Sequence, residues 1–280
     1  MKPPFTYYGG KMGMAERIIS LMPPHKVYME PFAGSLAVMF AKGRSTVEIV
    51  NDVDDDIVTF FRVLRDQPED LVRLCRLTPY AKAEYEEAKR PGPWEDLERA
   101  RRFWCRVNQS FAKTAALSTG WSITTARTQS GADSTQGRID RFLLCAERLS
   151  HVEIEHCDAA DLVKRLATSE TCIYADPPYL ASTRVMRRSG ASDYSHDMAD
   201  EESHERLADT LHATEAAVVL SGYPSPLYDS LYGDWWTVDI PVLVHSSNAT
   251  TTARAERIER LWTNREPNHG QFDFTMGAVS

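Results

Sequence analysis

The sequence predicts an α/β fold with a doubly wound, mostly parallel sheet that is interrupted by an inserted, mainly helical segment. Three observations lead to this prediction. Strand patterns alternate with helix patterns at both ends of the chain, several strands are apolar runs typical of strands covered on both faces, and the alternation stops in between. We expect one domain from 1–65 and 150–280 and an inserted helical domain at 66–149.

The first α/β unit begins with a short strand at 27–29. It is followed by the turn Glu30-Pro31-Phe32-Ala33-Gly34-Ser35 and by a helix that begins near Leu36. Glycine in such a turn lets a ligand approach the backbone closely, because glycine has no side chain to obstruct it. Taken alone, however, the turn is a weak signal of binding.

The second unit begins with the β-branched strand at 47–50, and Asp52 follows this strand. Acids at 54–56 suit the first turn of a helix, where they interact favourably with the helix dipole. In nucleotide-binding folds an acid placed like Asp52 accepts hydrogen bonds from a ribose, although a helix cap is an equally good interpretation. The apolar stripe of the helix consists of Ile57, Phe60, Phe61 and Leu64.

Five further strands and one further helix are predicted after the helical segment at 66–149. The last two of these strands suggest an antiparallel pair at one edge of the sheet. We predict strands at 152–155, 171–175, 217–221, 236–244 and 257–262, and a helix between Asp200 and Ala213.

Composition indicates an ordinary folded protein, with 42% hydrophobic and 26% charged residues among 280. No apolar run approaches the roughly 20 residues needed to span a bilayer, so we expect a cytoplasmic protein without membrane contact. The five cysteines form no CxxC pair or His/Cys cluster, which favours reduced thiols and no metal. The net charge of −8 argues against a protein that coats nucleic acid by bulk attraction, but 99–148 holds nine basic residues against three acids.

The strongest local signal is Asp176-Pro177-Pro178-Tyr179, which comes directly after the apolar strand at 171–175. Two successive prolines fix the backbone and cannot extend a central strand, so the chain must leave the sheet here. The Asp176 carboxylate and the nearby carbonyl groups are then held in fixed directions beside an aromatic ring. Such an arrangement predicts a binding pocket at this strand end.

With this motif the chain resembles the Dam-type DNA adenine N6-methyltransferases, and the resemblance covers nearly the whole chain. Asp176 to Tyr179 looks like the catalytic tetrapeptide of that family, and Asp52 like its ribose-binding acid. Leu36 departs from the pattern, because a second glycine usually stands there. The resemblance implies a class I methyltransferase-like sheet with a target-recognition domain at 66–149. Its other motifs here are Tyr7-Tyr8-Gly9-Gly10-Lys11 and Glu30-Pro31-Phe32-Ala33-Gly34-Ser35.

The resemblance implies transfer of a methyl group from S-adenosylmethionine to the N6 amino group of adenine in duplex DNA. An amino nitrogen whose lone pair is delocalised into the ring needs acceptors for its protons, which Asp176 and the Pro177 carbonyl can provide. Tyr179 would stack on a base that has been rotated out of the duplex. The expected catalytic residues are Asp176, Pro177, Pro178 and Tyr179. The expected cofactor-binding residues are Tyr7, Gly10, Lys11, Phe32, Gly34, Asp52, Asp158 and Asp176.

Contacts with double-stranded DNA are expected from the helical segment. Between 97 and 113 one face of a helix is apolar (Leu97, Ala100, Trp104, Val107 and Phe111) and is expected to face inward. The opposite face carries a basic stripe suited to DNA phosphates, although a plain solvated face is the alternative. Base-reading side chains are expected among 118–138. Arg184 and Arg187, soon after Tyr179, are expected to contact DNA around the rotated base, although a mobile loop is an equally good interpretation. The expected DNA-binding residues are therefore Arg99, Arg102, Arg106, Lys113, Arg127, Arg184 and Arg187.

Two other functions stay open at this point. A cytosine N4-methyltransferase would use the same acceptors for an exocyclic amino group, and a catalytically silent DNA-binding relative would keep the fold. The intact tetrapeptide argues against the silent protein. We expect a monomer or a weak dimer on DNA, acting in a restriction-modification setting.

Overall fold

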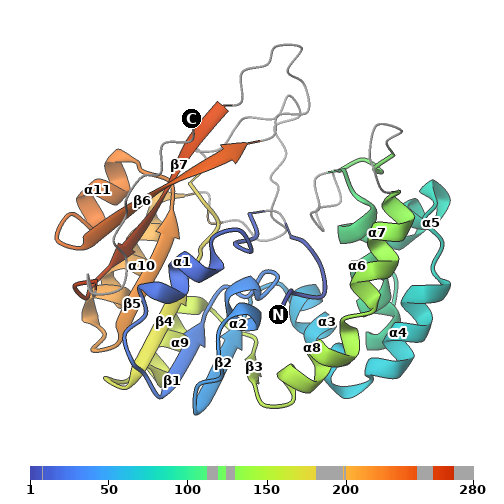
Figure 1. The fold of residues 1–280 in the computed structure, drawn as a ribbon, viewed down its shortest axis with the longest axis horizontal. Coiled ribbons are helices and arrows are strands. Elements are labelled where there is room, and N and C mark those ends of the chain that lie inside the picture. Colours follow the sequence, from blue (N-terminus) through green and yellow to red (C-terminus); the bar gives the residue numbers. More distant parts are fainter. Residues whose placement is uncertain are drawn as a thin grey trace, which may run out of the picture.

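The computed structural model describes residues 1–7, 9–111, 119–123, 130–180, 198, 200–244 and 255–267. Within these residues the chain forms a seven-stranded sheet in the order β3-β2-β1-β4-β5-β7-β6 (Figure 1). The strands are β1 (Val27–Glu30), β2 (Val47–Asn51), β3 (Glu153–Glu155), β4 (Thr171–Ala175), β5 (Ala217–Gly222), β6 (Trp236–Val244) and β7 (Ala255–Thr263).

The five strands from β3 to β5 in this order are parallel, whereas β7 is antiparallel to both β5 and β6. The predicted doubly wound, mostly parallel sheet with an antiparallel pair at one edge is therefore confirmed. Every residue of β4 and β5 is buried, as expected for central strands covered on both faces. The carboxyl ends of β1, β2 and β4 lie at one edge of the sheet, where α/β folds bind their ligands.

The helices lie on both faces of the sheet and in the segment between β2 and β3. Figure 1 shows α4 to α7 gathered on the side of the molecule away from α10 and α11. The helices are α1 (Ala15–Ser20), α2 (Ala37–Ala41), α3 (Asp55–Asp66), α4 (Pro68–Leu77), α5 (Lys82–Ala88), α6 (Asp96–Gln109), α7 (Gly131–Ile139), α8 (Phe142–Leu149), α9 (Ala159–Leu166), α10 (Glu201–Ala213) and α11 (Pro226–Leu231).

Helix α3 joins the helical segment to the sheet. Asp54 caps its first turn by accepting a hydrogen bond from the backbone N–H of Asp56. The predicted stripe is buried, and the ring of Phe60 lies 5.6 Å from that of Phe103 on α6 and 5.8 Å from that of Phe142 on α8. The helices at 66–149 thus share one hydrophobic core with the α/β part, and a separate domain with these bounds stays an interpretation.

Two details of the helical segment differ from the prediction. The helix expected to reach 113 ends at Gln109, because the next residue pairs as an isolated bridge with Trp121. Trp104 is fully buried, as predicted, but Phe111 lies beyond the helix end and is 56% exposed, so its assignment to the core was wrong.

All five cysteines are free thiols. None of the helices that the structure describes is long and apolar enough to cross a bilayer.

Candidate active site

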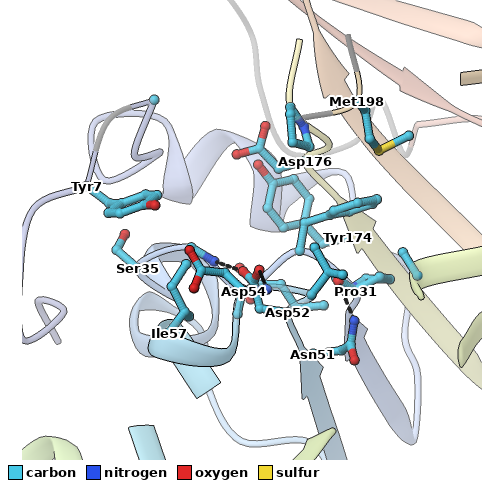
Figure 2. Close-up of a pocket in the computed structure, with 18 of the residues that line it drawn as sticks. Tyr7, Pro31, Ser35, Asn51, Asp52, Asp54, Ile57, Tyr174, Asp176 and Met198 are labelled. Carbon is cyan, nitrogen blue, oxygen red and sulfur yellow. Dashed lines mark hydrogen bonds between the residues drawn. The ribbon is translucent and has the colours of Figure 1, made fainter. Parts of the chain in front are cut away.

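A cavity of about 280 Å³ opens at the carboxyl ends of β1, β2 and β4 (Figure 2). Figure 2 shows Tyr7 on one wall, Asp176 and Met198 on the opposite wall, and Asp52 between them at the end of β2. Every residue that the sequence proposed for cofactor binding lines this cavity, although what it binds stays a prediction. These residues are Tyr7, Gly10, Lys11, Phe32, Gly34, Asp52, Asp158 and Asp176.

The turn after β1 has a left-handed backbone at two positions. Gly34 has a φ of 46°, and Leu36, where the family pattern has a second glycine, has a φ of 56°. A left-handed conformation costs a non-glycine residue about 1–2 kcal/mol. Burial of the Leu36 side chain, which has no exposed surface, offsets that cost, and the loop keeps its left-handed shape without the second glycine.

Asp52 is held rigidly between the two loops beside it. Its Oδ2 accepts a hydrogen bond from the Gly34 N–H at 3.0 Å, and its Oδ1 accepts one from the Asp54 N–H at 3.0 Å. The neighbouring Asn51 is 1% exposed and donates to the carbonyls of Pro31 (2.9 Å) and Cys157 (3.0 Å). Asn51 therefore fastens the loops after β1 and β3 to β2, which fixes the cavity floor beneath Asp52.

Asp158 caps the next helix and closes one side of the cavity. Its Oδ1 accepts hydrogen bonds from the first backbone N–H groups of α9, at 3.0 and 3.2 Å. Its Oδ2 forms an ion pair with Arg206 of α10, a cavity residue that the sequence did not single out. Because α10 comes more than 40 residues after Asp158 in the chain, only the folded structure brings this arginine to Asp158.

Asp176 occupies the corner predicted from the two prolines. Its Oδ2 lies 2.7 Å from the Lys11 Nζ, and its Oδ1 accepts a hydrogen bond from the Ser221 hydroxyl at 2.8 Å. The Asp176 side chain is 21% exposed and lines the cavity, as does Pro178. The carboxylate thus has a fixed direction and keeps an open side toward a ligand.

Lys11 is a buried cation that two acids share. Its Nζ donates to the Gly9 carbonyl at 2.7 Å and lies 3.2 Å from Glu259 Oε1, in addition to its contact with Asp176. Burial alone would lower the pKa of Lys11, but the negative charges of Asp176 and Glu259 outweigh it and raise the pKa above its ordinary value. Lys11 is therefore charged at neutral pH.

Tyr179 is held by its hydroxyl group, which donates to Glu259 Oε1 at 2.6 Å. Its ring centre lies 4.6 Å from that of Tyr223, and the residue is only 7% exposed. Stacking of a base on this ring stays a prediction. Sequence reasoning missed Glu259, because an acid between Ile258 and Arg260 is typical of a solvent-facing strand position. In the structure Ile258 is 49% exposed and Glu259 is buried.

Glu30 is a buried acid in the cavity wall and is 2% exposed. It accepts a hydrogen bond from the Tyr28 hydroxyl at 2.7 Å. Burial raises the pKa of Glu30 to about 8, with a further contribution from the charge of Asp176, although the Tyr28 hydrogen bond opposes this rise. Glu30 is therefore protonated at neutral pH.

The predicted basic stripe of α6 is not an exposed surface. Arg99 pairs with Asp55 and Asp56 of α3, at 2.6 and 3.1 Å. Arg106 pairs with Asp56 as well, and its side chain is 12% exposed. The prediction of a solvent-exposed stripe was wrong for Arg99 and Arg106, since acids of α3 already neutralise these two side chains.

Arg102 is the most deeply buried member of this set, with 7% of its side chain exposed. Its guanidinium group donates to Glu98 at 2.8 Å and to the Glu87 carbonyl at 2.6 Å, and it lies 3.7 Å above the ring of Trp94. DNA contact through Arg99, Arg102 or Arg106 stays a prediction. The other expected contacts, Lys113, Arg127, Arg184 and Arg187, lie outside the described residues, as does Tyr8.

Arg102→Glu should therefore destabilise the fold before it affects any ligand. The substitution places a buried acid beside Glu98 and Glu87, and loss of a buried charge partner typically costs about 3–5 kcal/mol. Urea denaturation would measure this loss of the free energy of unfolding. The matched control is Arg73→Glu on α4, whose side chain is 62% exposed and which should change the stability by less than about 1 kcal/mol. Equal stability of the two variants would contradict the assignment of Arg102 to the core.

Comparison with known proteins finds related methyltransferases. A family model described as "D12 class N6 adenine-specific DNA methyltransferase" matches residues 7–246. The Type II methyltransferase M1.LlaDCHI of Lactococcus lactis subsp. cremoris is 26% identical over an alignment that covers 93% of this chain and 95% of that protein. A DNA N-6-adenine-methyltransferase of Escherichia phage P1 is also 26% identical, over 82% of this chain but only 31% of the phage protein.

Likeness to solved structures is weaker. A crystal structure of a precorrin 8W decarboxylase from Methanobacterium thermoautotrophicum has 8% sequence identity to this chain and a TM-score of 0.42. The match covers 94% of this chain and 98% of that one. A likeness of this size carries no argument about the substrate of this cavity.

Proposed function

Since the chain belongs to the D12 class of N6 adenine-specific DNA methyltransferases, we propose that it transfers a methyl group from S-adenosylmethionine to the N6 amino group of an adenine rotated out of duplex DNA. The observation that supports this proposal is the cavity at the ends of β1, β2 and β4. It places Asp176 in the same space as every residue expected to hold the cofactor.

The residues of the cavity fit S-adenosylmethionine, which carries a positive charge on its sulfur. Four acids other than the neutral Glu30 line the space, against the two cations Lys11 and Arg206, so the lining favours a positively charged ligand. Asp52 would accept hydrogen bonds from the ribose, and Asp158 would contact the adenine. When bound, the cofactor supplies an electrophilic methyl group. The four acids are Asp52, Asp54, Asp158 and Asp176.

Asp176 would prepare the amino group of the target adenine. Its carboxylate is fixed by Lys11 and Ser221 and can accept a hydrogen bond from an N6 proton, as can the Pro177 carbonyl. Both interactions direct the nitrogen lone pair out of the ring plane and toward the methyl donor. Because the acceptors are already oriented, little reorganisation is needed in the transition state. Pro178 would keep this corner rigid, and Tyr179 would stack on the extruded base.

The same proposal covers the partners and the setting of the reaction. Double-stranded DNA is the partner, bound by a monomer or a weak dimer, and we place the reaction in the cytoplasm. A restriction-modification role is supported by the likeness to a Type II methyltransferase. Among the residues with a described placement, no group of three His, Cys, Asp or Glu side chains is arranged to hold a metal ion.

The chemical product tests the proposal directly. DNA from a host that lacks its own methylation, expressing this chain, should contain N6-methyladenine when it is digested to nucleosides and measured by mass spectrometry. The control is the same host carrying an empty vector. N4-methylcytosine as the product, or unmodified DNA despite a folded protein that binds the cofactor, would contradict the proposal. Sequencing with detection of modified bases would then identify the recognition site.

A further inference from the structure

Glu259 stands apart from the predicted site residues, because it comes from β7 and does not line the cavity. It is 5% exposed, and nevertheless it accepts a hydrogen bond from the Tyr179 hydroxyl and is the second acid beside Lys11 among the described residues. A buried carboxylate is costly to desolvate unless it is paired. Two contacts to site residues therefore suggest a role in the site itself.

The first contact concerns the Tyr179 hydroxyl, which has two acids within reach. It lies 2.6 Å from Glu259 Oε1 and 3.4 Å from Asp176 Oδ1. The shorter distance shows that Glu259 holds this hydroxyl. Without Glu259, the hydroxyl would turn to Asp176 and would occupy an oxygen that the substrate amino group needs.

The second contact concerns the charge of Lys11. This cation lies 2.7 Å from Asp176 and 3.2 Å from Glu259. If Asp176 were the only acid present, the Lys11 charge would be balanced by that carboxylate alone, and Asp176 would become a weaker acceptor. Two acids around one cation leave a net negative charge, and Asp176 is the acid that faces the cavity.

We propose that Glu259 is a positioning residue for methyl transfer, which holds the Tyr179 hydroxyl and shares Lys11 so that Asp176 remains free to accept a hydrogen bond from the substrate amino group. This inference rests on the proposed function. Glu259 acts through Tyr179, Lys11 and Asp176, and it does not itself touch the substrate.

Glu259→Gln tests this role, because glutamine keeps the size of the side chain and an oxygen acceptor but removes the charge. We expect the single-turnover rate of DNA methylation to fall about 10- to 100-fold, as is typical when reacting groups are misplaced. The dissociation constants for S-adenosylmethionine and DNA should change less than about twofold, because Glu259 lies outside the cavity. The matched control is Asp239→Asn on β6 of the same hairpin, whose side chain is 45% exposed. It should keep the wild-type rate.

Two further variants separate positioning from simple stabilisation. Glu259→Asp keeps the charge and should be faster than Glu259→Gln, and it also serves if the glutamine variant fails to fold. Tyr179→Phe should lower the rate, and adding Glu259→Gln to it should cost less than in the wild type, since the two side chains act together.

The pH profile gives a readout that a structural role would not move. The acids that face Lys11 are Asp176 and Glu259, with the Tyr179 hydroxyl beside them. Lys11 also holds the Asp176 carboxylate in its fixed direction, so activity should fall when Lys11 loses its proton. Removing the Glu259 charge lowers the pKa of Lys11, and this alkaline loss of activity should therefore begin at a lower pH in Glu259→Gln than in the wild type.

Two results would overturn the inference while the proposed function stands. One is an active wild type with an equally fast Glu259→Gln variant. The other is a variant whose rate loss is fully explained by weaker binding or by unfolding, with an unchanged pH profile. A wild-type protein that binds S-adenosylmethionine but yields no N6-methyladenine would instead refute the proposed function, and this inference with it.

Discussion

Asp176→Asn should reduce the single-turnover rate of DNA methylation by about 10²- to 10³-fold or more, the range seen when one oriented group that stabilises a transition state is removed. Asparagine keeps the shape of the side chain but loses the charge that pairs with Lys11, and it can present N–H groups to an amino group that needs acceptors. Transfer of a labelled methyl group to DNA would measure the rate. Calorimetry should show that S-adenosylmethionine still binds, because Asp52 and the loop after β1 are unchanged.

The N-terminal segment should stay in place in this variant, since Lys11 keeps its contacts with Glu259 and with the Gly9 carbonyl. Asp229→Asn is a suitable control, because it removes one carboxylate at a position whose side chain is 59% exposed. It should methylate DNA at the wild-type rate. An Asp176→Asn protein that is as active as the wild type would remove Asp176 from the catalytic machinery.

Glu30→Gln should stabilise the protein above pH 8 and flatten its dependence on pH. In the folded chain the pKa of Glu30 is raised to about 8, whereas an unfolded chain titrates this group near its ordinary value of 4.5. Between these values the folded state binds a proton that the unfolded state has released, so the stability that this group contributes is lost as the pH rises. Each pKa unit corresponds to about 1.4 kcal/mol, and the total is therefore several kcal/mol.

Urea denaturation at pH 5.5, 7 and 8.5 would measure this effect as a free energy of unfolding. The wild type should lose stability across the series relative to Glu30→Gln. Glu170→Gln is the control, because its side chain is 55% exposed and its replacement should leave the slope with pH unchanged. Parallel curves for the wild type and Glu30→Gln would show that Glu30 is already ionised in the folded protein.

Much of the cavity could be predicted from the sequence for a simple geometric reason. Parallel strands all end at the same edge, so Asp52 after one strand and Asp176 after another must lie near each other once both strands are recognised. The glycine turn marks the same edge. The fold class and the shared location of these residues therefore follow from local patterns.

The missed features depend on contacts between distant parts of the chain. Arg106 was expected on an exposed face, because its partner Asp56 lies on a different helix, 50 residues earlier in the chain. Part of the positive surplus of 99–148 is balanced in this way by acids outside that segment. Glu259 was missed because the burial of one face of β7 depends on how this strand pairs with β5 and β6, which the local sequence does not show.

The position of β7 makes the site depend on the antiparallel side of the sheet. This strand lies between β5 and β6 and carries Glu259 to its contacts with Lys11 and Tyr179. A change that shifts the register of β7 against β5 would therefore also displace Glu259 from these two residues.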